Sequence, residues 1–279
     1  MKKITNKLIS DFKTYLMDEE KSIATIDKYI RDITAFTVWL DERGTDKKAV
    51  LEYKAVLIQK YAPSSVNSML SSLNSFFAFN EWLDCRVKTI KVQKQIFSSE
   101  KKELMKSEYQ KLMKVAQQKQ NMKLFLLMQT ICATGIRVSE LKFITTEAVR
   151  MGEAVINCKG KMRMVLLPKQ LCKMLKKYIK EQNIKDGCVF VSKYGRPLDR
   201  SNIWRLMKAL CDCARVSKEK VFPHNLRHLF ARTYYSLEKD IVRLADILGH
   251  SSINTTRIYT IESGDVHRRQ IQQLGLLKW

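Results

Sequence analysis

Apolar residues recur at helical spacing through most of this 279-residue chain, and one polar, basic stretch interrupts them. In residues 1–90 the apolar positions repeat every three or four residues, which predicts a bundle of four helices. The interruption spans about residues 91–102, and such a change of composition is typical of a link between domains. We therefore predict two domains, residues 1–92 and 103–279, joined by a linker at 93–102, because a chain of this length suits two cores.

The second domain is predicted to be mostly helical, with one small β-hairpin. Its apolar spacing predicts helices near residues 106–118, 121–133, 169–183, 200–215, 224–236, 240–248 and 265–274. Two β-like runs, 154–158 and 164–167, flank a turn in which Gly160 can adopt a positive φ angle. The predicted fold class is therefore mainly α, with a mixed but mostly helical second domain.

The charge of the chain points to a polyanionic partner. The net charge is +23. Residues 1–95 hold 16 Lys and Arg against 12 Asp and Glu, whereas residues 96–279 hold 35 against 16, so the second domain carries most of the attraction. Seven scattered cysteines without a C-x-x-C pair predict reduced thiols in a cytoplasmic protein. We expect neither a signal peptide nor a membrane span.

Three of the four histidines gather with an arginine and a tyrosine in the last quarter of the sequence. In P-H-N-L-R-H, the residues His224, Arg227 and His228 are spaced i, i+3 and i+4, so they share one helix face. His250 closes L-G-H, and Tyr259 follows nine residues later. A guanidinium beside imidazoles suits a phosphate. A core histidine near a surface arginine is the alternative for the first motif alone.

Two further motifs lie upstream. Arg137 begins a short helix in A-T-G-I-R-V-S-E-L, where Glu140 can orient it; an ordinary surface ion pair is the alternative. Lys159, in the K-G-K of the hairpin, can deliver a proton to a leaving oxygen. A solvated turn lysine is the alternative there, and Lys161 is the neighbouring candidate. A phenol has an ordinary pKa of about 10 and needs nearby cations to act as a nucleophile, so Tyr259 with these cations favours phosphodiester chemistry.

In order and spacing, these motifs resemble those of the tyrosine recombinases, also called the phage integrase family. The matching motifs are A-T-G-I-R-V-S-E-L, K-G-K, H-x-x-R, L-G-H and the tyrosine nine residues later. The segment K-S-I-A-T-I-D-K-Y-I-R-D is similar to the family's N-terminal, SAM-like core-binding domain. The length of the chain is most similar to Xer-type recombinases and small mobile-element integrases.

The resemblance implies six catalytic residues, one supporting carboxylate, and neither metal nor cofactor. The catalytic residues are Arg137, Lys159, His224, Arg227, His250 and Tyr259. Tyr259 would attack the scissile phosphate and form a 3′-phosphotyrosyl bond, while the two arginines stabilise the transition state. Lys159 would protonate the leaving 5′-oxygen, and the two histidines would bind the phosphate or assist proton transfer. Glu140 would support the site, and His228 would be structural.

The resemblance also implies partners. Family members act as homotetramers on two double-stranded DNA sites and pass through a Holliday junction, in some cases with a second recombinase or an accessory factor. The C-terminal stretch 263–279, which fits an amphipathic helix with an apolar tail, would dock into the neighbouring protomer; an intramolecular tail is the alternative. We expect a nucleoid-associated, site-specific recombinase for mobile-element integration and excision or for Xer-like resolution, without a small-molecule substrate. A type IB topoisomerase-like enzyme and a non-catalytic architectural DNA-binding protein are the alternatives.

Overall fold

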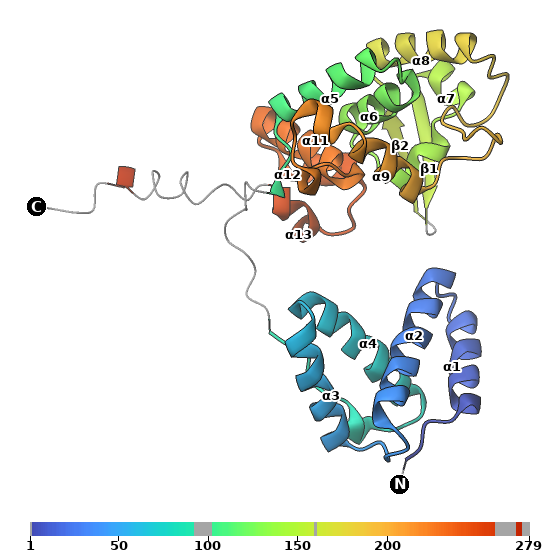
Figure 1. Cartoon of the computed structure of the whole chain (residues 1–279), viewed down its shortest axis with the longest axis vertical. Helices are drawn as coiled ribbons and strands as arrows, with labels where there is room; N and C mark the ends of the chain where they lie inside the picture. The colour runs from blue at the N-terminus through green and yellow to red at the C-terminus, as the bar shows by residue number, and fades with distance from the viewer. Residues whose placement is uncertain (1, 92–101, 159–160, 260–271, 275–279) are drawn as a thin grey trace, which may run out of the picture. The chain divides into compact units, whose positions relative to one another are not determined.

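The chain folds into two compact, mainly helical units. The computed structural model describes residues 2–91, 102–158, 161–259 and 272–274. Contacts divide the chain into residues 1–94 and 95–279, and a two-stranded antiparallel sheet lies in the second unit (Figure 1). This architecture confirms the predicted fold class. No helix in the described part of the chain has the length and apolar character that a membrane crossing requires.

The first unit is a bundle of four helices. They are α1 (Asn6–Asp18), α2 (Ile23–Leu40), α3 (Lys47–Lys60) and α4 (Pro63–Phe79), and a 3-10 turn, η1 (Leu83–Cys85), follows. Ser22 and Asp46 cap the second and third helices by accepting a backbone N–H of the first turn. Phe12 and Phe76 are fully buried and meet edge to face, with ring centroids 5.3 Å apart. These aromatic side chains therefore fill the core of the unit.

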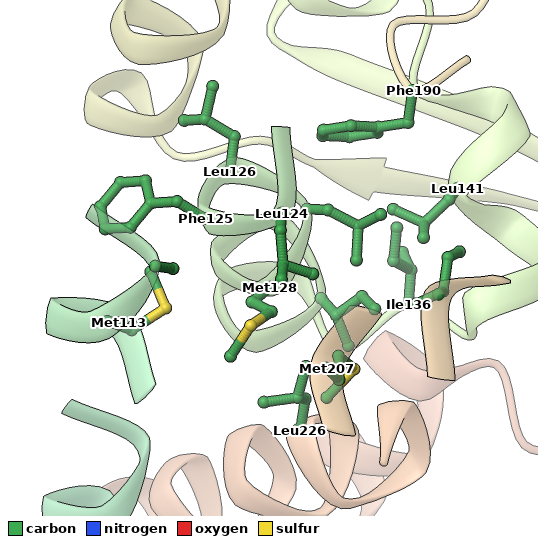
Figure 2. Packing of buried hydrophobic residues seen from close by; sticks show 14 of the residues in the cluster. Met113, Leu124, Phe125, Leu126, Met128, Ile136, Leu141, Phe190, Met207 and Leu226 are labelled. Carbon is green, nitrogen blue, oxygen red and sulfur yellow. The ribbon is translucent and has the colours of Figure 1, made fainter. Parts of the chain in front are cut away.

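The second unit is built around one buried helix, α6. Its elements are α5 (Lys106–Gln118), α6 (Met122–Thr134), η3 (Val138–Phe143), α7 (Thr146–Met151), β1 (Glu153–Cys158), β2 (Lys161–Leu166), α8 (Lys169–Glu181), α9 (Arg200–Lys208), α10 (Cys211–Ala214), η4 (Lys218–Lys220), α11 (Pro223–Glu238), α12 (Ile241–Leu248), α13 (Ile253–Thr256) and η5 (Arg257–Tyr259). Helices α5, α8, α9 and α11 pack against α6. Figure 2 shows Leu124 and Met128 of α6 among Ile136, Met207 and Leu226 from other elements.

Several helical elements differ from the sequence prediction. The helix predicted over 200–215 is two helices, because the chain tightens to a 3-10 bond from the Leu210 amide to the Met207 carbonyl (3.1 Å). The short helix after Arg137 is a 3-10 helix, η3, and α7 was not predicted because six residues show no clear helical period. The helix predicted over 265–274 lies outside the described residues except for its last three.

The hairpin is longer than predicted, and one charged side chain, Arg163, lies on its inward face among the side chains that the structure describes. Strand β2 begins at position 161 rather than 164, and its backbone register pairs Cys158 with Lys161. Ile156 and Val165 face the core, as alternation along a strand requires. Arg163 stands in the same inward-facing row as Val165, and its side chain is 15% exposed. A buried charge of this kind requires a partner.

Candidate active site

Arg227 lies at the centre of the predicted site and is almost completely buried. Pro223 begins α11, and Arg227 follows one turn later with 1% of its surface exposed. Its Nη1 donates a hydrogen bond to the carbonyl of Gly135 (2.6 Å), and its Nη2 donates to the carbonyl of Leu248 (2.8 Å). The same Nη2 lies 2.8 Å from His250 Nε2. One guanidinium therefore joins the C-terminal ends of α6 and α12 to the predicted catalytic histidine.

Glycines form the two helix ends that hold this guanidinium. Gly135 and Gly249 end α6 and α12 in the left-handed conformation, with φ angles of 67° and 65°. A Cβ atom would lie 2.5 Å from the Phe230 ring at Gly135 and 2.4 Å from Arg163 Cδ at Gly249. The carbonyls at a helix C-terminus carry partial negative charge, so these ends stabilise the Arg227 cation.

The hydrogen bonds of His250 define its tautomer. A guanidinium has donors and no acceptor, so His250 Nε2 accepts from Arg227 and the ring proton resides on Nδ1. Nδ1 then donates to the hydroxyl of Thr256, which is fully buried, at 2.8 Å. Burial and the charge of Arg227 lower the pKa of His250 to about 4. The imidazole is therefore neutral at pH 7, in agreement with this bonding pattern.

Tyr259 lies in the same chain as these groups and contacts them. It ends η5 with 4% of its surface exposed. Its ring meets His228 edge to face (centroids 4.8 Å apart) and is nearly parallel to the ring of His250 (6.0 Å, 18°). Burial and the charge of Arg137 lower the pKa of Arg227 to about 10, whereas the interaction with the Tyr259 hydroxyl raises it. Arg227 therefore remains a cation beside the phenol at neutral pH.

A buried carboxylate, Glu140, joins two arginines next to this cluster. Its Oε1 accepts from Arg137 Nη1 (2.8 Å), and its Oε2 accepts from the Arg137 backbone amide and from Arg163 Nη2, both at 2.7 Å. Burial alone raises the pKa of Glu140, but the Arg137 amide and the charges of Arg163 and Arg137 outweigh it, so the pKa lies below its ordinary value. The side chain of Arg137 is 41% exposed, so it can reach a ligand.

His224 stands at the exposed edge of the cluster. Its ring packs against His228, with the two centroids 4.4 Å apart. Partial burial, followed by the charges of Arg227, Arg200 and Arg137, lowers the pKa of His224. The imidazole is therefore biased toward its neutral form, which has one donor nitrogen and one acceptor nitrogen.

The structure brings together most of the predicted site residues. The gathered residues are Arg137, Glu140, His224, Arg227, His250 and Tyr259. Lys159 lies outside the described residues, and so does the side chain of Lys161. Among the described residues, no group of three or more His, Cys, Asp or Glu side chains is placed to hold a metal ion.

Sequence reasoning missed two residues of the site and one contact. The sequence contains one indication for Arg163, because it is a charged residue at an inward-facing position of a strand whose side chains alternate. Thr256 had none, because its role depends on the tautomer of His250. His228, interpreted as structural, contacts Tyr259 directly.

Replacing His228 with phenylalanine should reduce the acid sensitivity of the fold. Burial, His224 and Arg227 lower the pKa of His228 from 6.5 to about 4, and its buried Nε2 has no hydrogen-bond partner among the described residues. Between pH 6.5 and 4 the unfolded chain binds a proton that the folded chain does not, so stability is complete above this window and declines as the pH falls through it. His228→Phe keeps the ring contacts and removes this titration.

We expect His228→Phe to leave the free energy of unfolding at pH 7 unchanged or about 1 kcal/mol higher. The decrease in that free energy between pH 7 and pH 5 should be smaller than in the wild type. Urea unfolding followed by circular dichroism at both pH values measures the difference. An equal decrease in both proteins would show that His228 does not contribute to it.

Comparisons with known proteins agree on one family. The model of the phage integrase family matches residues 102–264, and the model of the phage integrase N-terminal SAM-like domain matches residues 9–83. Tyrosine recombinase XerA of Thermococcus kodakarensis is 31% identical over 282 residues, which cover 98% of this chain and 96% of the relative. The chain therefore belongs to the phage integrase family, and it is a site-specific tyrosine recombinase. No relative favours the topoisomerase or the architectural alternative.

Solved structures share the fold. A lambda integrase dimer bound to a COC′ core site superposes with a TM-score of 0.74 at 18% identity, over 91% of this chain and 94% of that one. A lambda integrase tetramer bound to a Holliday junction gives a TM-score of 0.72 at 18% identity, over 91% of this chain and 76% of that one. Both similarities extend over the N-terminal and catalytic units together.

Proposed function

We propose that this recombinase cuts and rejoins double-stranded DNA through a 3′-phosphotyrosyl intermediate on Tyr259. The observation that carries this proposal is the position of the Tyr259 phenol, against the Arg227 guanidinium and in contact with the rings of His228 and His250. A phenol is a poor nucleophile at neutral pH because its ordinary pKa is about 10. An adjacent fixed cation stabilises the phenolate and so supports attack on phosphorus.

Two arginines are proposed to neutralise the phosphate. Glu140 holds one Nη atom of Arg137, and the exposed part of that guanidinium can donate to a non-bridging oxygen. The Nε of Arg227 is buried and has no partner among the described residues, so it is an unused donor of the same guanidinium. Donors already fixed in place stabilise the charge of a pentavalent transition state without reorganisation.

The proposed proton transfers balance the reaction. The Tyr259 oxygen forms a bond to phosphorus as the bond from phosphorus to the 5′-oxygen breaks. The phenolic proton passes to the neutral imidazole of His224, which has an acceptor nitrogen, whereas Arg227 and Thr256 already occupy both ring nitrogens of His250. Lys159 gives a proton to the leaving 5′-oxygen, and the reverse sequence rejoins the strand. The phosphotyrosyl bond conserves the energy of the broken link, so the reaction requires no nucleotide cofactor.

The proposed assembly is a homotetramer on two DNA sites. The solved lambda integrase tetramer on a Holliday junction, which shares the fold, supports this proposal. The net charge of +23 supports a DNA partner. The C-terminal stretch 263–279, mostly outside the described part, is proposed to dock into a neighbouring protomer. The reaction serves mobile-element integration and excision or Xer-like resolution, which use the same strand chemistry.

The proposed function is tested with a nicked DNA duplex. Its site is first recovered from a randomised duplex library by selection for binding to the full chain. Cleavage next to the nick releases a short fragment, so the covalent intermediate accumulates because it cannot be rejoined. We expect a protein–DNA adduct that survives denaturation. A chain that binds the selected site tightly and never forms the adduct would support the architectural alternative.

The proposed general acid has its own test. Lys159→Ala should slow cleavage of the ordinary substrate by about 10² to 10⁴-fold, because proton transfer by a positioned side chain contributes a factor of this size. On a substrate with sulfur in place of the 5′-bridging oxygen, the rate should recover, since a thiolate leaves without a proton. The matched variant Lys161→Ala should show neither effect. If the two variants exchange behaviour, Lys161 is the acid, and equal losses on both substrates would exclude the role.

A further inference from the structure

Arg163 connects the hairpin to the residues that hold Arg137 and to the residues that hold Arg227. It lies on β2, and its Nη2 donates to Glu140 Oε2 (2.7 Å), while its Nη1 donates to the carbonyl of Ile247 (2.5 Å). The side chain is 15% exposed, whereas Met164, the next residue on the strand, is 58% exposed. The guanidinium therefore extends into the unit and bridges η3 and the C-terminal end of α12.

The Nη2 of Arg163 binds Glu140, the carboxylate that holds Arg137. Glu140 is 1% exposed and uses one oxygen for the Arg137 guanidinium and the other for the Arg137 amide and Arg163. Without Arg163, a buried carboxylate would lose one of its two cationic partners. The plane of the carboxylate, and with it the direction of the Arg137 side chain, depends on both partners.

The Nη1 of Arg163 binds the end of α12, the segment that holds Arg227. Ile247 precedes Leu248, whose carbonyl accepts from Arg227, and Gly249 packs directly on the Arg163 side chain. His250, the other partner of Arg227 Nη2, follows in sequence. Arg163 therefore touches the short segment that holds Arg227, at the point where α12 ends.

We propose that Arg163 is a positioning residue that fixes Arg137 and Arg227 relative to each other and links both to the hairpin. This inference rests on the proposed function, in which both arginines bind the scissile phosphate. Arg163 reaches no reacting atom, so its effect on the reaction passes through Glu140 and the end of α12. The role requires a planar fork with two separate donors, which arginine provides and lysine does not.

The test compares variants of the full chain on two nicked substrates, and also on the substrate with 5′-bridging sulfur that was used above for Lys159. One substrate carries the ordinary scissile phosphate, and the other carries a methylphosphonate, in which a methyl group replaces a non-bridging oxygen and removes the negative charge. The variants are Arg163→Gln, Arg163→Lys and Arg137→Ala, with Met164→Gln as the matched control on the outer face of the same strand. Single-turnover cleavage rates are compared with the wild type on each substrate, after circular dichroism and DNA binding have shown that each variant folds.

On ordinary phosphate we expect Arg163→Gln to cleave about 100-fold more slowly than the wild type, the cost of a misplacement of about 1 Å. The cleavage rate of Arg163→Lys should lie between those of Arg163→Gln and the wild type, and the rate of Met164→Gln should equal that of the wild type. On methylphosphonate, where a cation contributes less, the deficit of Arg163→Gln should shrink to about 3-fold or less, as for Arg137→Ala. If Arg163→Gln does not fold, Arg163→Lys carries the same comparison.

Three outcomes overturn the inference. The first is that Arg163→Gln cleaves at the wild-type rate, and the second is that its rate is reduced equally on phosphate and on methylphosphonate. The third is that its rate recovers on the substrate with 5′-bridging sulfur but not on methylphosphonate. The last would place the effect on the hairpin lysine. If Arg137→Ala also shows an equal deficit on both substrates, the phosphate-binding role of Arg137 in the proposed function fails. If Arg137→Ala recovers and Arg163→Gln does not, only the inference about Arg163 fails.

Discussion

Tyr259→Phe should form no covalent complex with nicked site DNA under conditions in which the wild-type protein does. Removal of a nucleophile leaves the rest of the site without a bond-forming atom, so we expect adduct formation to fall by at least about 10⁴-fold. The phenylalanine ring can keep the contacts of Tyr259 with His228 and His250. DNA binding, measured by mobility shift, should therefore change little.

Tyr235→Phe provides the matched control for this experiment. Tyr235 lies on α11 and packs against the same small apolar cluster as Tyr259. Loss of its hydroxyl should leave the adduct yield unchanged. If Tyr259→Phe still forms the adduct and Tyr235→Phe does not, the nucleophile is on α11 and the assignment of Tyr259 is wrong.

Arg227→Gln should lose both activity and stability. We expect cleavage to fall by about 10³-fold or more, because an arginine that stabilises transferring phosphate contributes a factor of this size. We also expect the free energy of unfolding to fall by about 3 kcal/mol. The carbonyls of Gly135 and Leu248 and the Nε2 of His250 would lose a charged donor in a buried setting. Single-turnover cleavage and urea unfolding measure the two effects.

Arg137→Gln separates catalysis from folding in this comparison. The Arg137 side chain is 41% exposed, and Glu140 would keep its bond to Arg163. Cleavage should fall by about 10²-fold, and stability should change by about 1 kcal/mol or less. Wild-type stability of Arg227→Gln would contradict the structural role of Arg227, and wild-type cleavage by either variant would contradict its role in binding the phosphate.

The sequence predicted residue types and helix faces well, and it predicted main-chain partners poorly. The i, i+3, i+4 spacing placed His224, Arg227 and His228 on one helix, where the structure has them. It gave no indication that Arg227 is buried, because its acceptors are carbonyls 92 and 21 residues away, and every residue has a carbonyl. Such partners depend on where two helices end, which is a tertiary property.

The hairpin and the α9–α10 region show the same limit. The apolar run 164–167 predicted β2 but placed its start three residues late, because the charged residues Lys161 and Arg163 interrupt the apolar pattern next to the turn. In the segment 200–215 the apolar spacing continues without interruption, so a single tightened turn leaves no mark on it.

Tyr259 and the groups that surround it, Arg227, His228 and His250, all come from one chain. Under the proposed function, a protomer that uses its own Tyr259 cuts the strand on which it sits. In an assembly of active and inactive copies, the position of each inactive copy would therefore determine which strand stays intact. Under the same proposal every protomer brings an identical nucleophile, so the order of strand exchange would be controlled through contacts between protomers.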